Sequence, residues 1–115
     1  MNDATTPVAD LKQLVTDFVA ERNWQRAHAP KHLAMSIAIE AAELMEHFQW
    51  VEVETPEAVK QDAERMQQVR EELSDVLAYA FSLANALDID ITQAFADKMK
   101  KNADKYPADE VRHWD

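Results

Sequence analysis

Glycine and cysteine are both absent from the 115 residues of this chain. Glycine supplies the positive φ angles and the close backbone approach to phosphate that dinucleotide-binding fingerprints and P-loops need, so both motifs are excluded. Without cysteine the chain has no disulfides and no thiolate metal site. Long apolar runs and a secretory signal are also lacking, which predicts a cytoplasmic protein with no membrane partner.

Positive charge is scarce as well. Asp and Glu number 22 against 12 Lys and Arg, which gives a formal net charge of −10 and a pI near 4.7. A surface of this sign repels nucleic acid, so we expect no nucleic-acid partner. An anionic ligand would need local positive charge, from a metal ion or from the basic cluster Lys98, Lys100, Lys101 and Lys105.

The residues that are abundant favour helices. Ala, Leu, Met, Glu, Lys and Gln dominate, the apolar positions repeat near 3.6 residues, and no alternating β pattern is found, which predicts an all-α fold. We expect a single domain over residues 1–115, a helical bundle of about four main helices. Its core should span about residues 11–107, with a loosely held tail after 107. A chain of this length buries a modest core, so an oligomer would complete the bundle.

Hydroxyl and proline pairs mark the helix starts. Thr6-Pro7 predicts an N-cap and first residue for the first helix, and Pro30 opens a second helix that should run to about Trp50. Thr55-Pro56 repeats the start signal, but the segment 56–68 is either a separate turn or the beginning of the next helix. Asp90-x-x-Gln93 resembles a capping box for a last helix ending at Tyr106-Pro107, with Ile91, Ala94, Phe95 and Met99 facing inward.

Two short pairs of acids, Glu40-x-x-Glu43 and Glu72-x-x-Asp75, lie inside the most apolar stretches of the chain. Residues three apart share a helix face, so both helices carry acids beside surface that must be buried. Removing a carboxylate from water is unfavourable unless a cation compensates its charge. Oxygen ligands suit Mg²⁺, with Mn²⁺ as a substitute. The pairs therefore predict a metal site across a helix interface, with a chain of surface acids as the alternative.

Other polar and aromatic residues are candidates for a ligand site, although each has an ordinary structural explanation. Trp24, His28 and Trp50 flank the second helix and Tyr79 lies one turn after Asp75, so they would form either an aromatic pocket beside the acids or part of the core. His47, one turn after Glu43, is either a ligand or an exposed residue at a helix end. One side of the last helix carries four further candidates, which form either a solvated face or a phosphate-binding face: Lys98, Asn102, Lys105 and Tyr106.

The order of these features is specific. It comprises Glu21-Arg22-Asn23-Trp24, His28-x-Pro30, Glu40-x-x-Glu43-Leu44-x-Glu46-x-Phe48-Gln49-Trp50, Glu71-Glu72-Leu73-Ser74-Asp75-Val76-Leu77-x-Tyr79 and Lys98-x-x-x-Asn102-x-x-Lys105-Tyr106-Pro107. From about Leu11 to Pro107 the chain resembles the MazG-like all-α nucleoside triphosphate pyrophosphohydrolases, in particular their small dCTP-pyrophosphatase type.

This resemblance implies an enzyme that hydrolyses a nucleoside triphosphate to the monophosphate and pyrophosphate, with Mg²⁺, in a house-cleaning or pool-balancing role. It implies that Glu40, Glu43, Glu72 and Asp75 hold the metal and carry catalysis. Phosphate contacts would come from Lys98, Asn102, Lys105 and Tyr106, and the base pocket from Trp24, His28, Trp50 and Tyr79. It also implies a homodimer or homotetramer with the site near a subunit interface.

The chemistry of the residues agrees with that activity. Hydrolysis of a phosphoanhydride needs charge neutralisation and an oriented water, which Mg²⁺, lysines and a carboxylate base supply. Glu43 or a neighbouring acid would be the base. Two rivals remain: a non-catalytic acidic helical interaction module, and a carboxylate-bridged di-metal bundle, which needs Glu-x-x-His motifs on core helices. The one such motif, Glu110-x-x-His113, lies in the tail.

Overall fold

A computed structural model describes residues 1–111, which form helices, turns and connecting segments without any strand. The long helices are α1 (Val8–Glu21), α2 (Pro30–Glu46), α4 (Ala63–Ala86) and α5 (Ile91–Lys105), and short ones are η1 (Gln25–Ala27), α3 (Pro56–Lys60) and α6 (Ala108–Val111). The prediction of an all-α fold with about four main helices is therefore confirmed. In this range no helix combines the length and the apolar character needed to cross a membrane.

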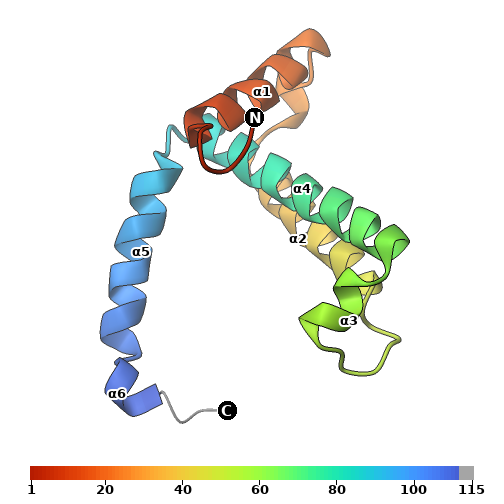
Figure 1. The fold of residues 1–115 in the computed structure, drawn as a ribbon. Coiled ribbons are helices and arrows are strands. Elements are labelled where there is room, and N and C mark those ends of the chain that lie inside the picture. The colour runs from red at the N-terminus through yellow and green to blue at the C-terminus, as the bar shows by residue number, and fades with distance from the viewer. Residues whose placement is uncertain (112–115) are drawn as a thin grey trace.

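An antiparallel pair of helices, α2 and α4, forms the centre of the structure (Figure 1). The first helix, α1, packs on α4 near the end at which α4 finishes. The buried core is small and is shared by these three helices, with Val19 on α1, Leu33 on α2 and Ala84 on α4 at 9%, 1% and 2% exposure. The core thus fixes how the acid-bearing faces of α2 and α4 meet.

Three of the predicted helix starts are found where the sequence places them, and the first is Pro30, which begins α2. The Thr55 hydroxyl accepts a hydrogen bond from the Ala58 amide at 3.2 Å, and Pro56 is the first residue of α3. The Asp90 carboxylate accepts from the Gln93 amide at 2.9 Å and so caps α5. Each side chain satisfies a backbone donor that has no partner within its own helix.

The predicted start of the first helix is wrong. Pro7, rather than Thr6, is the N-cap residue of α1, which begins at Val8 without a side-chain cap. The Thr6 hydroxyl instead accepts a hydrogen bond from the Asn2 amide at 3.1 Å, while the Thr6 amide donates to the Asn2 carbonyl at 3.0 Å. A turn closed by Asn2 therefore uses the hydroxyl that would otherwise have capped the helix.

The boundaries around the loop between α2 and α4 also differ from expectation. α2 ends at Glu46 rather than near Trp50, and the chain turns where the Phe48 and Gln49 amides both donate to the Met45 carbonyl. The segment 56–68 combines the two alternatives, since α3 is a separate short helix and residues from Ala63 onward belong to α4. Its break is set by Asp62, whose carboxylate accepts from the Arg65 amide at 3.1 Å and caps α4.

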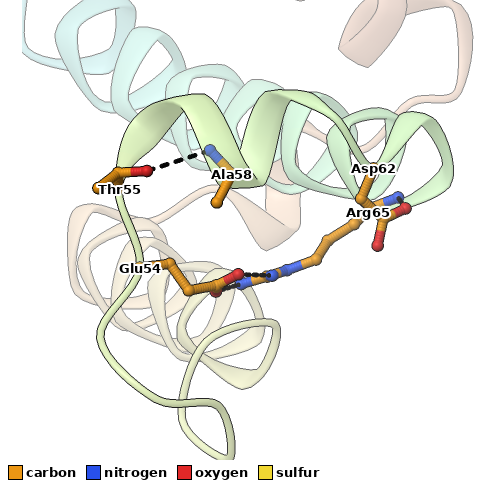
Figure 2. A network of polar contacts seen from close by, with 5 residues as sticks. All are labelled: Glu54, Thr55, Ala58, Asp62 and Arg65. Atoms are coloured by element: carbon orange, nitrogen blue, oxygen red, sulfur yellow. Dashed lines mark hydrogen bonds and ion pairs between the residues drawn. The ribbon is translucent and has the colours of Figure 1, made fainter.

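This loop is fixed by a polar network shown in Figure 2. Both nitrogens at the end of the Arg65 guanidinium bond the Glu54 carboxylate, at 2.6 and 2.9 Å. The same guanidinium lies over the Phe48 ring, 4.8 Å from its centre. Because Phe48 lies two residues after the end of α2 and Arg65 lies in the first turn of α4, the network joins the two central helices where the loop connects them.

Helix ends that usually need glycine are made here by Asn and Asp. Asn23 after α1 and Asp88 after α4 both have a φ of 54°. In each case the next residue donates back to the third carbonyl from the helix end, Trp24 to Val19 and Ile89 to Ala84. This is the Schellman arrangement, and it sends Trp24 back against the body of α1.

The last long helix, α5, extends away from the other helices (Figure 1). Phe95 and Met99, which were predicted to face inward, are 67% and 51% exposed, so that prediction is wrong for a single chain. The turn after α4 directs α5 outward, and no other described helix packs extensively on it. The predicted loose tail begins with α6, and residues 112–115 lie outside the described part of the chain.

Candidate functional site

Antiparallel packing of α2 against α4 brings three of the four predicted acids together. Glu40 and Glu43 on α2 and Glu72 on α4 each offer one carboxylate oxygen, and these three oxygens lie within 4.8 Å of one another. All three side chains are half-buried. Glu40 and Glu43 are three residues apart and hence share the face of α2 that meets α4.

Asp75, the fourth predicted acid, lies beside this cluster. It is exposed and does not belong to the group of mutually close oxygens. Asp75 lines the same cleft as Glu40, and its charge contributes to the shifted pKa of Glu40. The structure therefore brings the four acids to one region, with Asp75 at its open side.

The cluster is electrostatically unfavourable without a cation. The pKa of Glu40 is raised to about 7, mainly by burial and also by a hydrogen bond to Glu43 and by repulsion from Glu43, Asp75 and Glu72. One oxygen each of Glu40 and Glu72, Oε2, is buried and has no hydrogen-bond partner. Carboxylates held in this way fit a hard divalent cation, which supplies both the missing charge and the missing contacts.

His47 also contacts the cluster. As the C-cap residue of α2 it is half-buried rather than exposed, and its Nε2 atom lies 3.7 Å from Oε1 of Glu72. That distance is too long for a hydrogen bond, although it allows an ion pair when the imidazole is protonated. His47 therefore joins the end of α2 to the acid-bearing face of α4.

A cleft of about 450 Å³ opens beside the acids. Its lining includes the acids Glu40 and Asp75 and the ring-bearing residues Trp24, His28 and Tyr79. The Trp24 ring meets Phe18 of α1 edge to face, with ring centres 5.6 Å apart and an interplanar angle of 72°. Three of the four predicted pocket residues thus lie with the acids around one cavity.

The fourth predicted pocket residue, Trp50, does not line this cleft. It follows the end of α2 and is 87% exposed. The sequence placed Trp50 on the second helix, but the chain leaves the helix at Glu46 and carries Trp50 outward.

The structure does not bring the predicted phosphate-binding residues to the acids within one chain. Lys98, Asn102 and Lys105 belong to α5 and Tyr106 is its C-cap residue, and none of them lines the cleft. The Asn102 amide contacts Met99 Sδ at 3.8 Å, and the Lys105 ammonium lies 5.3 Å from the Tyr106 ring centre.

Sequence reasoning missed one polar residue of the cleft, Ser82 on α4. It is 8% exposed and lines both the main cleft and an adjoining cavity of about 260 Å³. The spacing of Asp75, Tyr79 and Ser82 at i, i+4 and i+7 was the available signal, because residues at these intervals share a helix face.

Comparisons with known proteins show what the sequence resembles. The model of the MazG-like family matches residues 35–114. The dCTP pyrophosphatase 1 of Mus musculus is 37% identical over 98 residues, which cover 85% of this chain and 58% of that protein. The Homo sapiens dCTP pyrophosphatase 1 is 36% identical over 99 residues, covering 86% and 58%. The chain thus spans 58% of the length of these curated relatives.

A solved structure shares the fold as well. The crystal structure of a pyrophosphatase from Archaeoglobus fulgidus superposes with a TM-score of 0.79 and 36% identity, over 93% of this chain and 98% of that chain. The family match covers more than half of the sequence and includes most of α2, the whole of α4 and all four acids. This chain therefore belongs to the MazG-like family.

Proposed function

We propose that this chain is a Mg²⁺-dependent nucleoside triphosphate pyrophosphohydrolase. It converts a (deoxy)nucleoside triphosphate and water into the monophosphate and pyrophosphate, and dCTP or a modified relative is among its best substrates. The observation that carries the proposal is the meeting of Glu40, Glu43 and Glu72 at the edge of a cleft bordered by aromatic rings. The names of the related pyrophosphatases support it.

Glu40, Glu43, Glu72 and Asp75 are the residues that would hold the metal, with Mn²⁺ as a substitute for Mg²⁺. The buried oxygens of Glu40 and Glu72 that lack a hydrogen-bond partner support this assignment. When bound, Mg²⁺ neutralises the negative charge of the phosphates, which is the main requirement for phosphoryl chemistry. The exposed side of the cluster, at Asp75, leaves room for the triphosphate.

The remaining tasks fall to the side chains of the chain itself. Glu43 or a neighbouring acid would act as the general base, with a carboxylate oxygen that does not bind the metal accepting a proton from the attacking water. Trp24 and Tyr79 would border the flat base, since aromatic rings stack on bases of any identity. His28 lines the same cleft and would offer a hydrogen bond at the edge of the base.

We further propose a homodimer or homotetramer in which α5 of one copy serves the cleft of another. Lys98, Asn102, Lys105 and Tyr106 would then contact the phosphates. The exposed apolar side chains of α5, Phe95 and Met99 among them, support such packing, because a monomer would leave this surface in water. In the cell, the activity would remove unwanted nucleotides or balance the nucleotide pool.

A substrate panel tests the function. The purified protein is incubated with each of the common dNTPs and NTPs in the presence of Mg²⁺, Mn²⁺ or EDTA, and the products are identified. We expect monophosphate and pyrophosphate with either metal and none with EDTA. Release of orthophosphate with a diphosphate product, or no release from any nucleotide, would contradict the proposal. Water labelled with ¹⁸O then identifies the phosphorus that is attacked.

A further inference from the structure

Ser82 is the buried polar residue of the cleft for which neither the fold nor the metal site accounts. It is 8% exposed, and the hydrogen bonds described for residues 1–111 leave its hydroxyl without a partner. A serine within a helix often donates to the carbonyl four residues earlier. Ser74 on the same helix does so, to Arg70 at 2.7 Å. The Ser82 hydroxyl is not among the buried oxygens that lack a partner in this part of the chain, so water in the cleft that Ser82 lines can reach it. A polar group of a bound ligand would take the place of that water.

The position of Ser82 indicates which part of a ligand reaches it. Asp75, Tyr79 and Ser82 follow one another along the cleft-lining stripe of α4. Seven residues of α-helix span about 10 Å, so Ser82 lies roughly one nucleoside monophosphate length from the acids. A triphosphate held at the acid end would extend its sugar and base past Tyr79 toward Ser82.

The surroundings of Ser82 favour the edge of the base over the sugar. Trp24, His28 and Tyr79 line the same cleft and provide flat surfaces for the face of a ring. Beyond Ser82 the adjoining cavity of about 260 Å³ is also lined by His28 and by Asn85, whose amide already donates to Thr16 and to the Lys12 carbonyl. The free hydroxyl of Ser82 therefore stands where the rim of a stacked ring would meet the protein.

We infer that Ser82 is a specificity-determining residue whose hydroxyl bonds a polar group on the edge of the nucleobase. A hydroxyl can donate and accept, and therefore pairs with either an amino or a carbonyl group. This inference rests on the proposed function. It supplies a polar contact that stacking cannot, because stacking tolerates every base.

Two variants test the inference without changing the metal site. Ser82→Ala removes the hydroxyl, and Ser82→Cys replaces it with a slightly larger thiol, which is a weak hydrogen-bond donor. Ser74→Ala is the matched control, since Ser74 lies on the same helix but bonds its own backbone. Circular dichroism and thermal melting check that each variant folds.

The readouts are kcat and KM for dCTP, dTTP, dATP and dGTP, and the affinity for dCMP by calorimetry. In both Ser82 variants we expect KM for the preferred nucleotide to rise roughly twofold to tenfold, as the loss of one hydrogen bond predicts, with kcat little changed. The ratio of kcat/KM for the preferred nucleotide to kcat/KM for the other nucleotides should fall by the same factor. If dCTP is the preferred nucleotide, the affinity for dCMP should fall by that factor as well. Ser74→Ala should match the parent.

Two results would overturn the role of Ser82 while leaving the proposed function intact. One is an unchanged ratio of kcat/KM among the four nucleotides in an active Ser82→Ala variant. The other is an equal rise of KM for all four, which would assign Ser82 to the sugar. An unaltered protein that releases no pyrophosphate from any nucleotide would overturn the proposed function, and this inference with it.

Discussion

Arg65 and Glu54 form an ion pair with two hydrogen bonds, at 2.6 and 2.9 Å, between the loop after α2 and the first turn of α4. The two side chains are only 15% and 25% exposed. The hydrogen bonds from Arg65 hold the pKa of Glu54 below its ordinary value of 4.5. The pair thus connects the two acid-bearing helices at the end where a loop joins them (Figure 2).

We predict that Glu54→Gln lowers the melting temperature, because it removes the carboxylate and leaves a partly buried guanidinium without its charge partner. Since the pKa of Glu54 is lowered on folding, its contribution is present above pH 4.5 and is lost as the pH falls through the lower folded value. The difference between parent and variant should therefore shrink in acid. Thermal melting over a range of pH measures it.

Glu52→Gln provides the control, because Glu52 is exposed, lies in the same loop and carries the same charge. If both variants melt at the same temperature near neutral pH, the Arg65–Glu54 pair contributes nothing to stability. A smaller loss in Glu52→Gln would assign the effect to the pair rather than to net charge.

Glu40 predicts the opposite dependence on pH. Its pKa is raised from 4.5 to about 7 in the folded chain, so the folded state without metal holds a proton that the unfolded state has lost. Stability of the metal-free protein should fall as the pH rises from 4.5 to about 7. Glu40→Gln cannot ionise, and its melting temperature should change less across this window.

The affinity for Mg²⁺ should also depend on whether Glu40 is protonated. A cation that displaces this proton binds more tightly as the pH rises through about 7. Isothermal titration with Mg²⁺ at several pH values would show this in the parent. An affinity that is constant across the window would mean that Glu40 is already ionised or does not contact the ion.

Replacement of the acids should separate folding from activity. We predict that Glu43→Gln and Asp75→Asn remain helical but lose at least about 100-fold in Mg²⁺-dependent turnover. Both variants remove like-charge repulsion and should melt no lower than the parent without metal. They should also gain less stability from millimolar Mg²⁺, since only a ligand that binds the folded state raises its stability.

Glu46→Gln is the matched control, because Glu46 ends α2 and is exposed. Near-normal turnover of Glu43→Gln at saturating metal would remove Glu43 from the mechanism. A parent protein that Mg²⁺ does not stabilise would favour the acidic interaction module over a metal enzyme.

The aromatic side of the cleft should affect binding more than chemistry. We predict that Trp24→Ala raises KM for the preferred nucleotide roughly fivefold or more, as the loss of one stacked base predicts, and that kcat changes less. His28→Ala should act in the same direction. Steady-state kinetics with dCTP measures both, and an unchanged KM in both variants would exclude this pocket.

Trp50→Ala addresses a residue that the sequence assigned to the pocket and that is 87% exposed in the single chain. A raised KM in this variant would mean that Trp50 reaches the cleft of another copy. Parental kinetics would leave Trp50 outside the site.

The exposed apolar side chains of α5 predict that the protein forms oligomers. We expect light scattering at micromolar concentration to give the mass of a dimer or tetramer. Phe95→Glu places a charge on the apolar face of α5, where Phe95 is 67% exposed, and should lower both the mass and the turnover. Thr92→Glu changes charge on the same helix near its start and serves as the control. A monomeric mass for the parent protein would contradict the prediction.

The local character of the chain could be predicted from its sequence because the responsible forces act over a few residues. Helix propensity and the 3.6-residue apolar repeat predicted the all-α fold, and Thr55 and Asp90 predicted two caps. The pairs Glu40/Glu43 and Glu72/Asp75 each share a helix face by spacing alone. Their apolar neighbours predicted that the carboxylates would be partly buried, as three of them are.

Contacts between distant segments decided the rest. Two departures are nonetheless local, because a turn at Asn2 uses the hydroxyl of Thr6 and a turn at Met45 ends α2 before Trp50. Only the antiparallel packing of α2 on α4 determined that Glu72 meets Glu40 and Glu43 while Asp75 stays at the open side. Burial within that interface then raised the pKa of Glu40 and left the Ser82 hydroxyl facing a cavity, because desolvation depends on which surfaces the tertiary structure brings together.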